Sequence, residues 1–166
     1  MRLKFLIIPF FIVLTSCSNL DFILKEDVNL TSPTYKKTTI ILSGVDIPSF
    51  YSQTLKYFGE YDENLYQLKI KINEEKIKKS VETNQAISKL EYKLTFNYEL
   101  LNNKLNCIVY KKEIISRFTY EPKSSGYNFG SDQSLINFYE EAAYISLQEF
   151  IGYIYNMNLD LCSNEN

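Results

Sequence analysis

The chain has 166 residues, of which 45% are hydrophobic and 15% aromatic, with 18 Lys and Arg against 20 Asp and Glu. This length suits one ordinary domain, and the aromatic content argues against intrinsic disorder. The formal net charge of −2 leaves no basic excess for general nucleic-acid binding. The chain has no histidine, which excludes Ser-His-Asp and Cys-His catalysis and zinc sites built on histidine.

Residues 1–16 have the pattern of a secretory signal peptide. Arg2 and Lys4 form a short positive region, and residues 5–14 form an uninterrupted apolar stretch. As a helix this stretch would be about 15 Å long, half of the ~30 Å hydrocarbon core of a bilayer. It is therefore predicted to be a cleaved signal rather than a membrane-spanning helix.

The end of the signal resembles a bacterial lipobox, with an aliphatic residue, two small residues and a cysteine in Leu14-Thr15-Ser16-Cys17. The resemblance implies that the Cys17 thiol receives a diacylglycerol and that Cys17 becomes the acylated first residue of the mature chain. Several acyl chains on one residue hold a protein stably on a membrane. Because Ser18 rather than Asp follows Cys17, the resemblance further implies the periplasmic leaflet of the outer membrane. The alternative is an ordinary signal-peptidase site beside a chance cysteine.

The rest of the chain divides into a predicted lipidated tether at 17–35, a domain at 36–157 and a polar C-terminal tail at 158–166. The tether lacks any sustained hydrophobic period, as expected for a segment that lets the domain stand off the membrane. Its apolar run Phe22-Ile23-Leu24 could dock on the domain or on the lipid surface.

The domain begins with a predicted strand and helix. Residues 37–43 are rich in β-branched side chains and end at Gly44, which is typical of a strand. Pro48 lies where a helix would begin, and Gly59 lies where it would stop. A strand, helix, strand succession implies that the first two strands are parallel.

Three segments with period-two alternation follow, beginning at residue 66, at residue 89 and after a hairpin at Asn102-Asn103. Asn tolerates positive φ, so these two residues favour a tight turn. One face of each strand is apolar and the other polar, as in an antiparallel sheet covered on one side. The inward positions are Tyr66, Leu68, Ile70, Ile72, Leu90, Tyr92, Leu94, Phe96, Tyr98, Leu100, Ile108, Tyr110, Ile114, Phe118 and Tyr120.

A last helix is predicted over about 132–156, capped by Ser131 or Asp132. Its inner face comprises Leu135, Tyr139, Ala142, Ala143, Leu147, Phe150, Ile151 and Ile154. The predicted fold is therefore α+β, a two-layer sandwich. A four-stranded mixed sheet in the order β-α-β-β-β-α carries two helices on one face.

Two cysteines remain in the mature chain, Cys107 and Cys162. An oxidising periplasm would permit a disulfide between them, adding ~4 kcal/mol of stability on the chain-entropy model. A buried strand position explains Cys107 equally simply as a small hydrophobic residue, and this unpaired interpretation is favoured.

The sequence has no catalytic, metal-binding or cofactor-binding signature. It lacks a glycine-rich phosphate loop, and its cysteines form no paired CxxC motif. Glu140-Glu141 is better explained as a solvated helix face than as a catalytic carboxylate pair. A non-enzymatic protein without a cofactor is predicted.

The polar face of the predicted sheet gathers basic side chains that could meet the phosphates of an anionic lipid. The candidate contact residues are Lys69, Lys71, Lys93, Lys111 and Arg117. Glu91, Glu99 and Glu113 share this face, so an ordinary solvated sheet surface remains the alternative.

The lipobox, the tether and the β-α-β-β-β-α order together resemble the LPS-assembly lipoprotein family, LptE. The stretch from Lys89 to Ile154 carries the likeness, as LEYKLTFNYELL, then KLNCIVYKKEIISRFTYEPKSSGYNFGS, then DQSLINFYEEAAYISLQEFIGYI. The resemblance implies that the protein seats inside the outer-membrane barrel LptD, aids its assembly and is able to bind lipopolysaccharide. Two other classes stay open: an auxiliary lipoprotein of an ABC-type lipid or solute transport system, and an anchored enzyme.

Overall fold

The computed structural model describes residues 31–81, 87–121, 129–159 and 161–162. The predicted signal peptide, Cys17 and most of the predicted tether lie outside these residues. The elements in chain order are β1 (Thr38–Gly44), α2 (Phe50–Phe58), β2 (Tyr66–Val81), β3 (Ile87–Asn102), β4 (Cys107–Tyr120) and α3 (Phe129–Tyr155).

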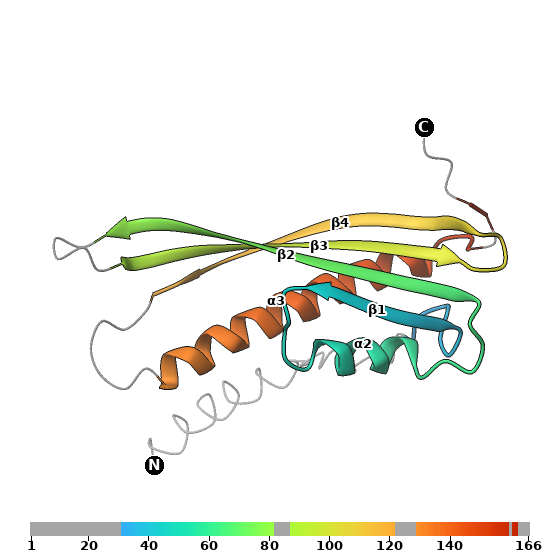
Figure 1. The fold of residues 1–166 in the computed structure, drawn as a ribbon, viewed down its shortest axis with the longest axis horizontal. Helices are drawn as coiled ribbons and strands as arrows, with labels where there is room; N and C mark the ends of the chain where they lie inside the picture. The colour runs from blue at the N-terminus through green and yellow to red at the C-terminus, as the bar shows by residue number, and fades with distance from the viewer. Residues whose placement is uncertain (1–30, 82–86, 122–128, 160, 163–166) are drawn as a thin grey trace, which may run out of the picture.

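The predicted fold class is confirmed. The four strands form one sheet in the order β1-β2-β3-β4, with β1 parallel to β2 and the other pairs antiparallel. Both helices lie against the same face of this sheet, and α3 runs along most of its length (Figure 1). The alternation of apolar and polar residues explains this two-layer arrangement, because only one face of the sheet needs to be buried.

The core lies between the sheet and the two helices. The inward positions of β2 and β3 contribute Leu68, Ile70, Leu94, Phe96, Tyr98 and Leu100, each with 0% of its surface exposed. From the helices come the buried residues Phe50, Phe58, Ala142, Ala143, Leu147, Phe150, Ile151 and Ile154. The predicted inner faces of β2, β3 and the middle and end of α3 are thus confirmed.

Gly44 fixes where β1 ends. It has φ of +94°, and a Cβ at this position would lie 1.9 Å from the carbonyl oxygen of Ile72. Only glycine allows the backbone to pass so close to β2 in this conformation. The chain leaves the sheet here, so the described part of β2 beyond Ile72 has no strand on its β1 side.

The hairpins are much longer than ordinary strands. Both β2 and β3 contain 16 residues and β4 contains 14, against roughly five or six in a typical strand. Among the described elements, the N-terminal half of α3 is the one that lies along the half of the sheet past Gly44 (Figure 1). Aromatic rings fill this interface, with Phe118 stacked between Tyr92 at 5.1 Å and Phe138 at 5.5 Å, as ring-centroid distances.

Both predicted helix starts are wrong by a few residues. α2 begins at Phe50, two residues after Pro48, because the chain first turns at Ser49 with φ of +59°. α3 begins at Phe129, so Ser131 and Asp132 lie within its first turn rather than capping it. The predicted stop of α2 is confirmed, since the Gly59 N–H donates to the Leu55 carbonyl at 2.7 Å.

The return strand also departs from strict alternation. Leu100 pairs with Tyr110 while Leu101 pairs with Ile108, so a β-bulge places one extra residue in β4. Val109 is consequently the buried residue, at 1% exposure, and the prediction that Ile108 points inward is wrong. The turn before it has its positive φ at Asn106.

Two parts of the chain outside the predicted domain pack onto it. Ser32 and Thr34 are buried, and the Ser32 N–H donates to the Tyr57 carbonyl at 2.9 Å. At the other end, Cys162 forms a disulfide with Cys107, with Cα atoms 5.9 Å apart. The favoured interpretation of Cys107 as an unpaired small hydrophobe is therefore wrong.

Candidate functional site

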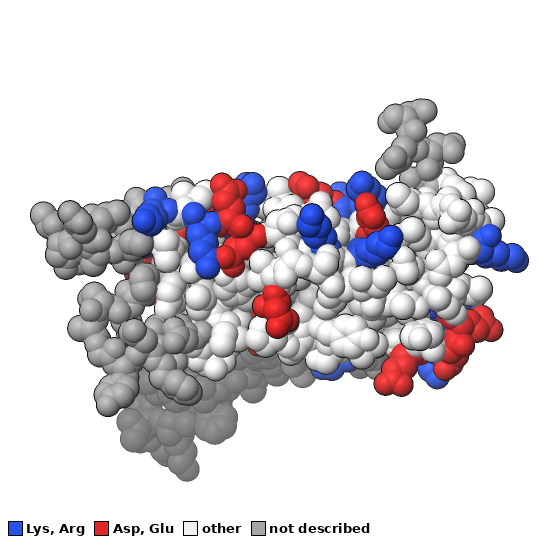
Figure 2. All heavy atoms as spheres, viewed as in Figure 1, with Lys and Arg blue, Asp and Glu red and all other residues white. Residues whose placement is uncertain are grey.

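The face of the sheet that points away from the helices carries the predicted contact residues. We call it the outer sheet face and define it by the outward residues of β2, β3 and β4. They are Gln67, Lys69, Lys71, Asn73, Glu75, Ile77, Glu91, Lys93, Thr95, Asn97, Glu99, Leu101, Ile108, Lys111, Glu113, Ile115, Arg117 and Thr119. The charges visible along the sheet in Figure 2 are of both signs and closely interleaved.

The five predicted contact residues form two groups on the outer sheet face. In the first group Lys69 and Lys111 lie on either side of Glu99 in register, and Lys71 lies one row further along β2. Lys111 Nζ is 3.2 Å from the Glu99 carboxylate. Because Lys69, Lys71 and Lys111 are all exposed, their ammonium groups are accessible to an external anion.

The second group lies further along the same strands. Lys93 pairs in register with Glu75 on one side and with Arg117 on the other. Its Nζ is 3.2 Å from the Glu75 carboxylate, so the exposed Arg117 guanidinium is the less compensated charge of this row. An uncharged row of Asn73, Thr95 and Ile115 separates the two groups.

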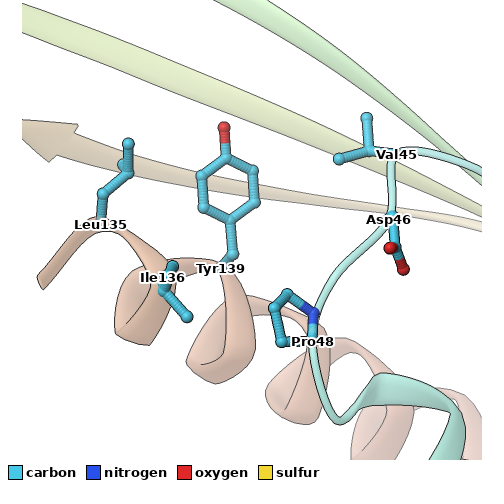
Figure 3. Close-up of a pocket in the computed structure, with 6 residues that line it drawn as sticks. All are labelled: Val45, Asp46, Pro48, Leu135, Ile136 and Tyr139. Atoms are coloured by element: carbon cyan, nitrogen blue, oxygen red, sulfur yellow. The ribbon is translucent and has the colours of Figure 1, made fainter. Parts of the chain in front are cut away.

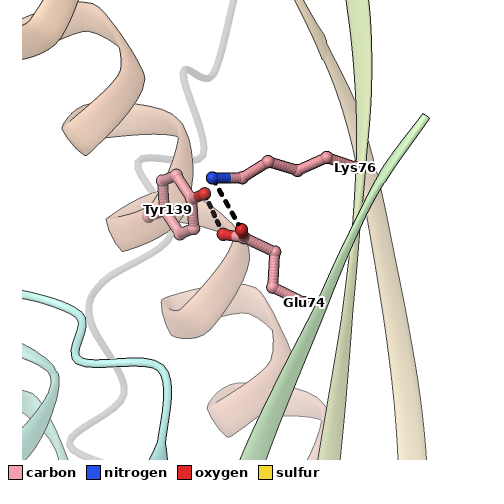
Figure 4. A network of polar contacts seen from close by, with 3 residues as sticks. All are labelled: Glu74, Lys76 and Tyr139. Atoms are coloured by element: carbon pink, nitrogen blue, oxygen red, sulfur yellow. Dashed lines mark hydrogen bonds and ion pairs between the residues drawn. The ribbon is translucent and has the colours of Figure 1, made fainter. Parts of the chain in front are cut away.

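The opposite, helix-facing side holds a feature that the sequence analysis missed. Beyond Ile72 the inward positions of β2 become Glu74 and Lys76, which form an ion pair at 2.9 Å. The Tyr139 hydroxyl of α3 donates a hydrogen bond to the same carboxylate (Figure 4). The ammonium of Lys76 also lies 5.4 Å from the ring centroid of Tyr92.

This network changes the proton affinity of its members. The hydrogen bond to Glu74 raises the pKa of Lys76. Burial, followed by the hydrogen bond to Glu74, raises the pKa of Tyr139. The raised pKa values keep Lys76 and Tyr139 protonated, so each can donate a hydrogen bond to the Glu74 carboxylate. The sequence contained a signal for this network, because charged residues at inward positions such as Glu74 and Lys76 indicate that the inner face of the strand is no longer fully buried there.

Next to this network lies an open groove of about 320 Å³, which we call the α3 groove (Figure 3). The loop after β1 provides one wall and the N-terminal half of α3 provides the other. The lining residues are Val45, Asp46, Pro48, Leu135, Ile136 and Tyr139. Its surface is mainly apolar, and its volume lies at the lower end of the range for small-molecule sites.

The two walls of the α3 groove are fastened together at one end. The Ser49 hydroxyl donates to the Glu140 carboxylate at 2.8 Å, which joins the chain before α2 to α3. The Gln53 amide donates to the same Ser49 oxygen at 3.0 Å. Glu140 therefore has a structural partner in the chain before α2.

We find no group of three or more His, Cys, Asp or Glu side chains placed to hold a metal ion among the residues that the structure describes. Within the same ranges, none of the helices combines the length and the apolar character needed to cross a bilayer.

Comparison with solved structures identifies the fold as one seen in lipoproteins. A candidate lipoprotein of Caulobacter crescentus CB15 superposes with a TM-score of 0.52 at 15% identity, covering 76% of this chain and 90% of that protein. Rare lipoprotein B of Shewanella oneidensis superposes with a TM-score of 0.50 at 9% identity, covering 69% and 92%. No known protein family and no curated protein sequence matches the chain. At these identities the likeness establishes the fold alone.

Proposed function

We propose that this chain is a non-enzymatic outer-membrane lipoprotein, anchored through Cys17 in the periplasmic leaflet, that plugs the LptD barrel and helps to assemble it for lipopolysaccharide transport. The lipobox and the resemblance to LptE suggest this role, and the lipoprotein-like fold is consistent with it. One structural observation carries the argument. The long hairpin exposes a mixed-charge outer sheet face while the core and both helices lie behind it.

The polarity of the outer sheet face matches the polarity of a barrel lumen. The interior of a wide outer-membrane barrel is polar, so a plug must present polar groups over its own buried core. The outer sheet face does so along strands of up to 16 residues. Interleaved charges of both signs favour a partner surface with the complementary charge pattern. A surface that places like charges against each other loses several kcal/mol of binding free energy.

The basic groups give lipopolysaccharide a point of contact. Its phosphates would form charge-assisted hydrogen bonds with ammonium and guanidinium groups. Lys69, Lys71 and Lys111 can approach one such phosphate together, since they share one end of the outer sheet face. Arg117 and Lys93 offer a second position further along the strands, about 14 Å from the row of Lys71 and about 20 Å from the row of Lys69 and Lys111, at roughly 3.4 Å per residue.

Charge reversal tests the role of the outer sheet face. The variant Lys69→Glu, Lys71→Glu, Lys111→Glu should reduce recovery of the barrel complex from mild-detergent envelopes by about tenfold or more, which corresponds to roughly 1.4 kcal/mol. The same variant should keep its cooperative thermal unfolding, because exposed ion pairs contribute only ~0.2–1 kcal/mol. Lys56→Glu, on the exposed side of α2, is the matched control and should leave recovery unchanged.

Two results would overturn the proposal. One is unchanged recovery of the barrel with the triple variant. The other is recovery of inner-membrane transport components in place of a barrel, which would favour the auxiliary-lipoprotein alternative.

The anchor has its own test. Cys17→Ala should release the protein from the membrane fraction and abolish incorporation of labelled palmitate. Membrane fractionation of the Cys17→Ala protein, or absence of label in the wild type, would contradict lipidation at Cys17.

A further inference from the structure

Strand β4 forms an open edge of the sheet. β3 lies on one side of it, and no described strand lies on the other (Figure 1). From Tyr110 to Tyr120 this edge is roughly 34 Å long, at about 3.4 Å per residue. The backbone N–H and C=O groups that point away from β3 have no strand partner within the described ranges, so the edge is a template for a further strand.

The side chains of this edge leave two charges and one apolar group without a partner of their own kind. Among the described residues, neither Glu113 nor Arg117 takes part in an ion pair. Both are exposed on the outer sheet face, and Ile115 lies between them with 42% of its surface exposed. Glu113 and Arg117 are about 14 Å apart along the strand, at roughly 3.4 Å per residue, so β4 itself does not bring them together.

A second copy that runs antiparallel along this edge would compensate all three groups at once. With the two-fold axis at Ile115, Glu113 of each copy faces Arg117 of the other, and Ile115 packs against its own counterpart. Lys111 faces Thr119 in the same register. Side chains directly opposite each other on neighbouring strands have Cβ atoms about 5 Å apart, which is close enough for an ion pair. The outer half of the edge is therefore complementary to itself, as a two-fold interface requires.

The helix-facing side of β4 accepts the same register. The facing residues there are aromatic, aliphatic or small apart from one lysine, so no two like charges lie opposite each other. The pairs are Tyr110 with Tyr120, Ile114 with Ser116, and Lys112 with Phe118. The pair of lysine and phenylalanine places a cation beside an aromatic ring, which is a favourable contact.

Neighbouring registers fit less well. An axis at Glu113 or at Arg117 sets two identical charges opposite each other. An axis at Ile114 sets Lys111 against Arg117. An axis at Ser116 sets no like charges together, but it pairs neither Glu113 nor Arg117 with an opposite charge. Like charges directly opposite each other destabilise a strand pair, so the charge pattern selects the axis at Ile115.

We propose that two copies of this chain pair antiparallel through β4, about a two-fold axis at Ile115, and continue the sheet from one copy into the other. Charged side chains on an edge strand commonly prevent pairing with other chains. Here the same charges oppose most partners and favour a second copy in one register. The two outer sheet faces then form one continuous surface. This pairing goes beyond the proposed function, because it needs neither lipidation nor a barrel.

Sedimentation velocity tests the pairing. The protein used is the full chain from residue 17, with Cys17→Ala, in buffer without lipid or detergent. We expect a monomer–dimer equilibrium that shifts toward the dimer as the concentration rises. Glu113→Arg and Arg117→Glu each set like charges opposite each other at two places in the dimer. Each change should therefore raise the dimer dissociation constant by about tenfold or more.

Mixing the two single variants provides a rescue. One copy with Glu113→Arg and one with Arg117→Glu again have opposite charges at both places, so the equimolar mixture should dimerise like the wild type. The double variant Glu113→Arg, Arg117→Glu should do the same by itself. Far-UV circular dichroism and thermal unfolding establish that every variant is folded. A change in folding alone would not be reversed by mixing two separately folded proteins.

A cross-link locates the axis. Ile115→Cys sets a thiol opposite its own counterpart, and a short bis-maleimide should join the two chains. Ile41→Cys is the matched control. Ile41 has the same 42% exposure and also points to the outer side of the sheet, but it lies on β1 at the other edge. The control should stay monomeric on denaturing gels at the same concentrations.

Three outcomes would overturn the pairing. They are a wild type that sediments as a monomer up to its solubility limit, a mixture of single variants that associates no better than either variant alone, and equal cross-linking through Ile115→Cys and Ile41→Cys. None of these measurements involves acylation or a barrel, so the pairing can fail while the proposed function stands, and the reverse.

Discussion

Cys107, the first residue of β4, is bonded through its sulfur to Cys162, which follows α3. The disulfide closes a loop with a sequence separation of 55 residues, which includes all of β4 and α3. It ties the end of the helical layer to the sheet at the β3–β4 turn. A bond of this kind persists in oxidising compartments such as the periplasm, which agrees with the predicted export of the chain.

Removing this bond should destabilise the fold substantially. For a loop of this length the chain-entropy model gives about 4 kcal/mol. We expect Cys107→Ser, Cys162→Ser to lower the free energy of unfolding by roughly this amount, measured by urea titration of the non-acylated chain. The reduced wild type is the control and should behave like the double variant. An unchanged urea midpoint would show that the bond does not constrain the unfolded chain.

Gly44 should be intolerant of any side chain. Gly44→Ala would place a Cβ against the Ile72 carbonyl oxygen in a backbone conformation that non-glycine residues rarely adopt. The expected loss is about 2 kcal/mol or more, since both strain and a steric clash contribute. Gly152→Ala is the matched control. A Cβ at Gly152, within α3, would meet no atom within 4 Å, so this change should be neutral or stabilise by ~0.5–1 kcal/mol. Equal melting temperatures for the two variants would contradict the assigned role of Gly44.

The strands and the fold class were predictable because the sheet has one solvent-exposed face and one buried face. That arrangement imposes a period of two on side-chain polarity, which is visible from Tyr66 and from Leu90 onward. Local chemistry also predicted the helix stop at Gly59, since that residue needs positive φ. Where the strict alternation breaks, as at the bulge beside Val109, the pattern predicted the wrong inward residue.

The remaining features depend on contacts between distant segments. The disulfide pairs positions separated by 55 residues, and no local pattern distinguishes a paired from an unpaired Cys107. The α3 groove likewise joins Pro48 to Ile136, which neither segment reveals alone. For the outer sheet face the sequence predicted which residues share it. It could not predict their division into two groups, because that follows from the register of β2 against β3 and β4.

Tyr98 should make the stability of the fold fall at alkaline pH. Burial raises its pKa above the ordinary value of 10.0, and its hydroxyl is 2.9 Å from Ser146 Oγ in the core. Because the folded state holds this proton more tightly than the unfolded state, the contribution is fully present below pH 10 and declines as pH rises further. Urea midpoints measured on either side of pH 10 should show this decline, with Tyr92, Tyr110 and Tyr139 adding to it because burial also raises the pKa of each.

The control for this effect is Tyr98→Phe. It should cost about 1–2 kcal/mol at neutral pH, because Ser146 loses its buried partner. Its stability should then decline less steeply above pH 10 than that of the wild type. Identical slopes for the two proteins would assign the alkaline destabilisation to other groups.

The contact between Tyr139 and Glu74 should be worth more than the exposed ion pairs of the outer sheet face. The Glu74 side chain is only 17% exposed, and it accepts from Tyr139 while pairing with Lys76. A double-mutant cycle with Tyr139→Phe and Glu74→Leu, which removes the acceptor, should give a coupling of about 1.5–3 kcal/mol, the range for hydrogen bonds to charged groups. A second cycle on Lys111 and Glu99, whose side chains are 54% and 32% exposed, should give below ~1 kcal/mol. If the two couplings were equal, the Tyr139–Glu74 contact would hold α3 to β2 no more strongly than an exposed ion pair does. The aromatic packing around Phe118 would then be the stronger tie among the described residues of this half of the sheet.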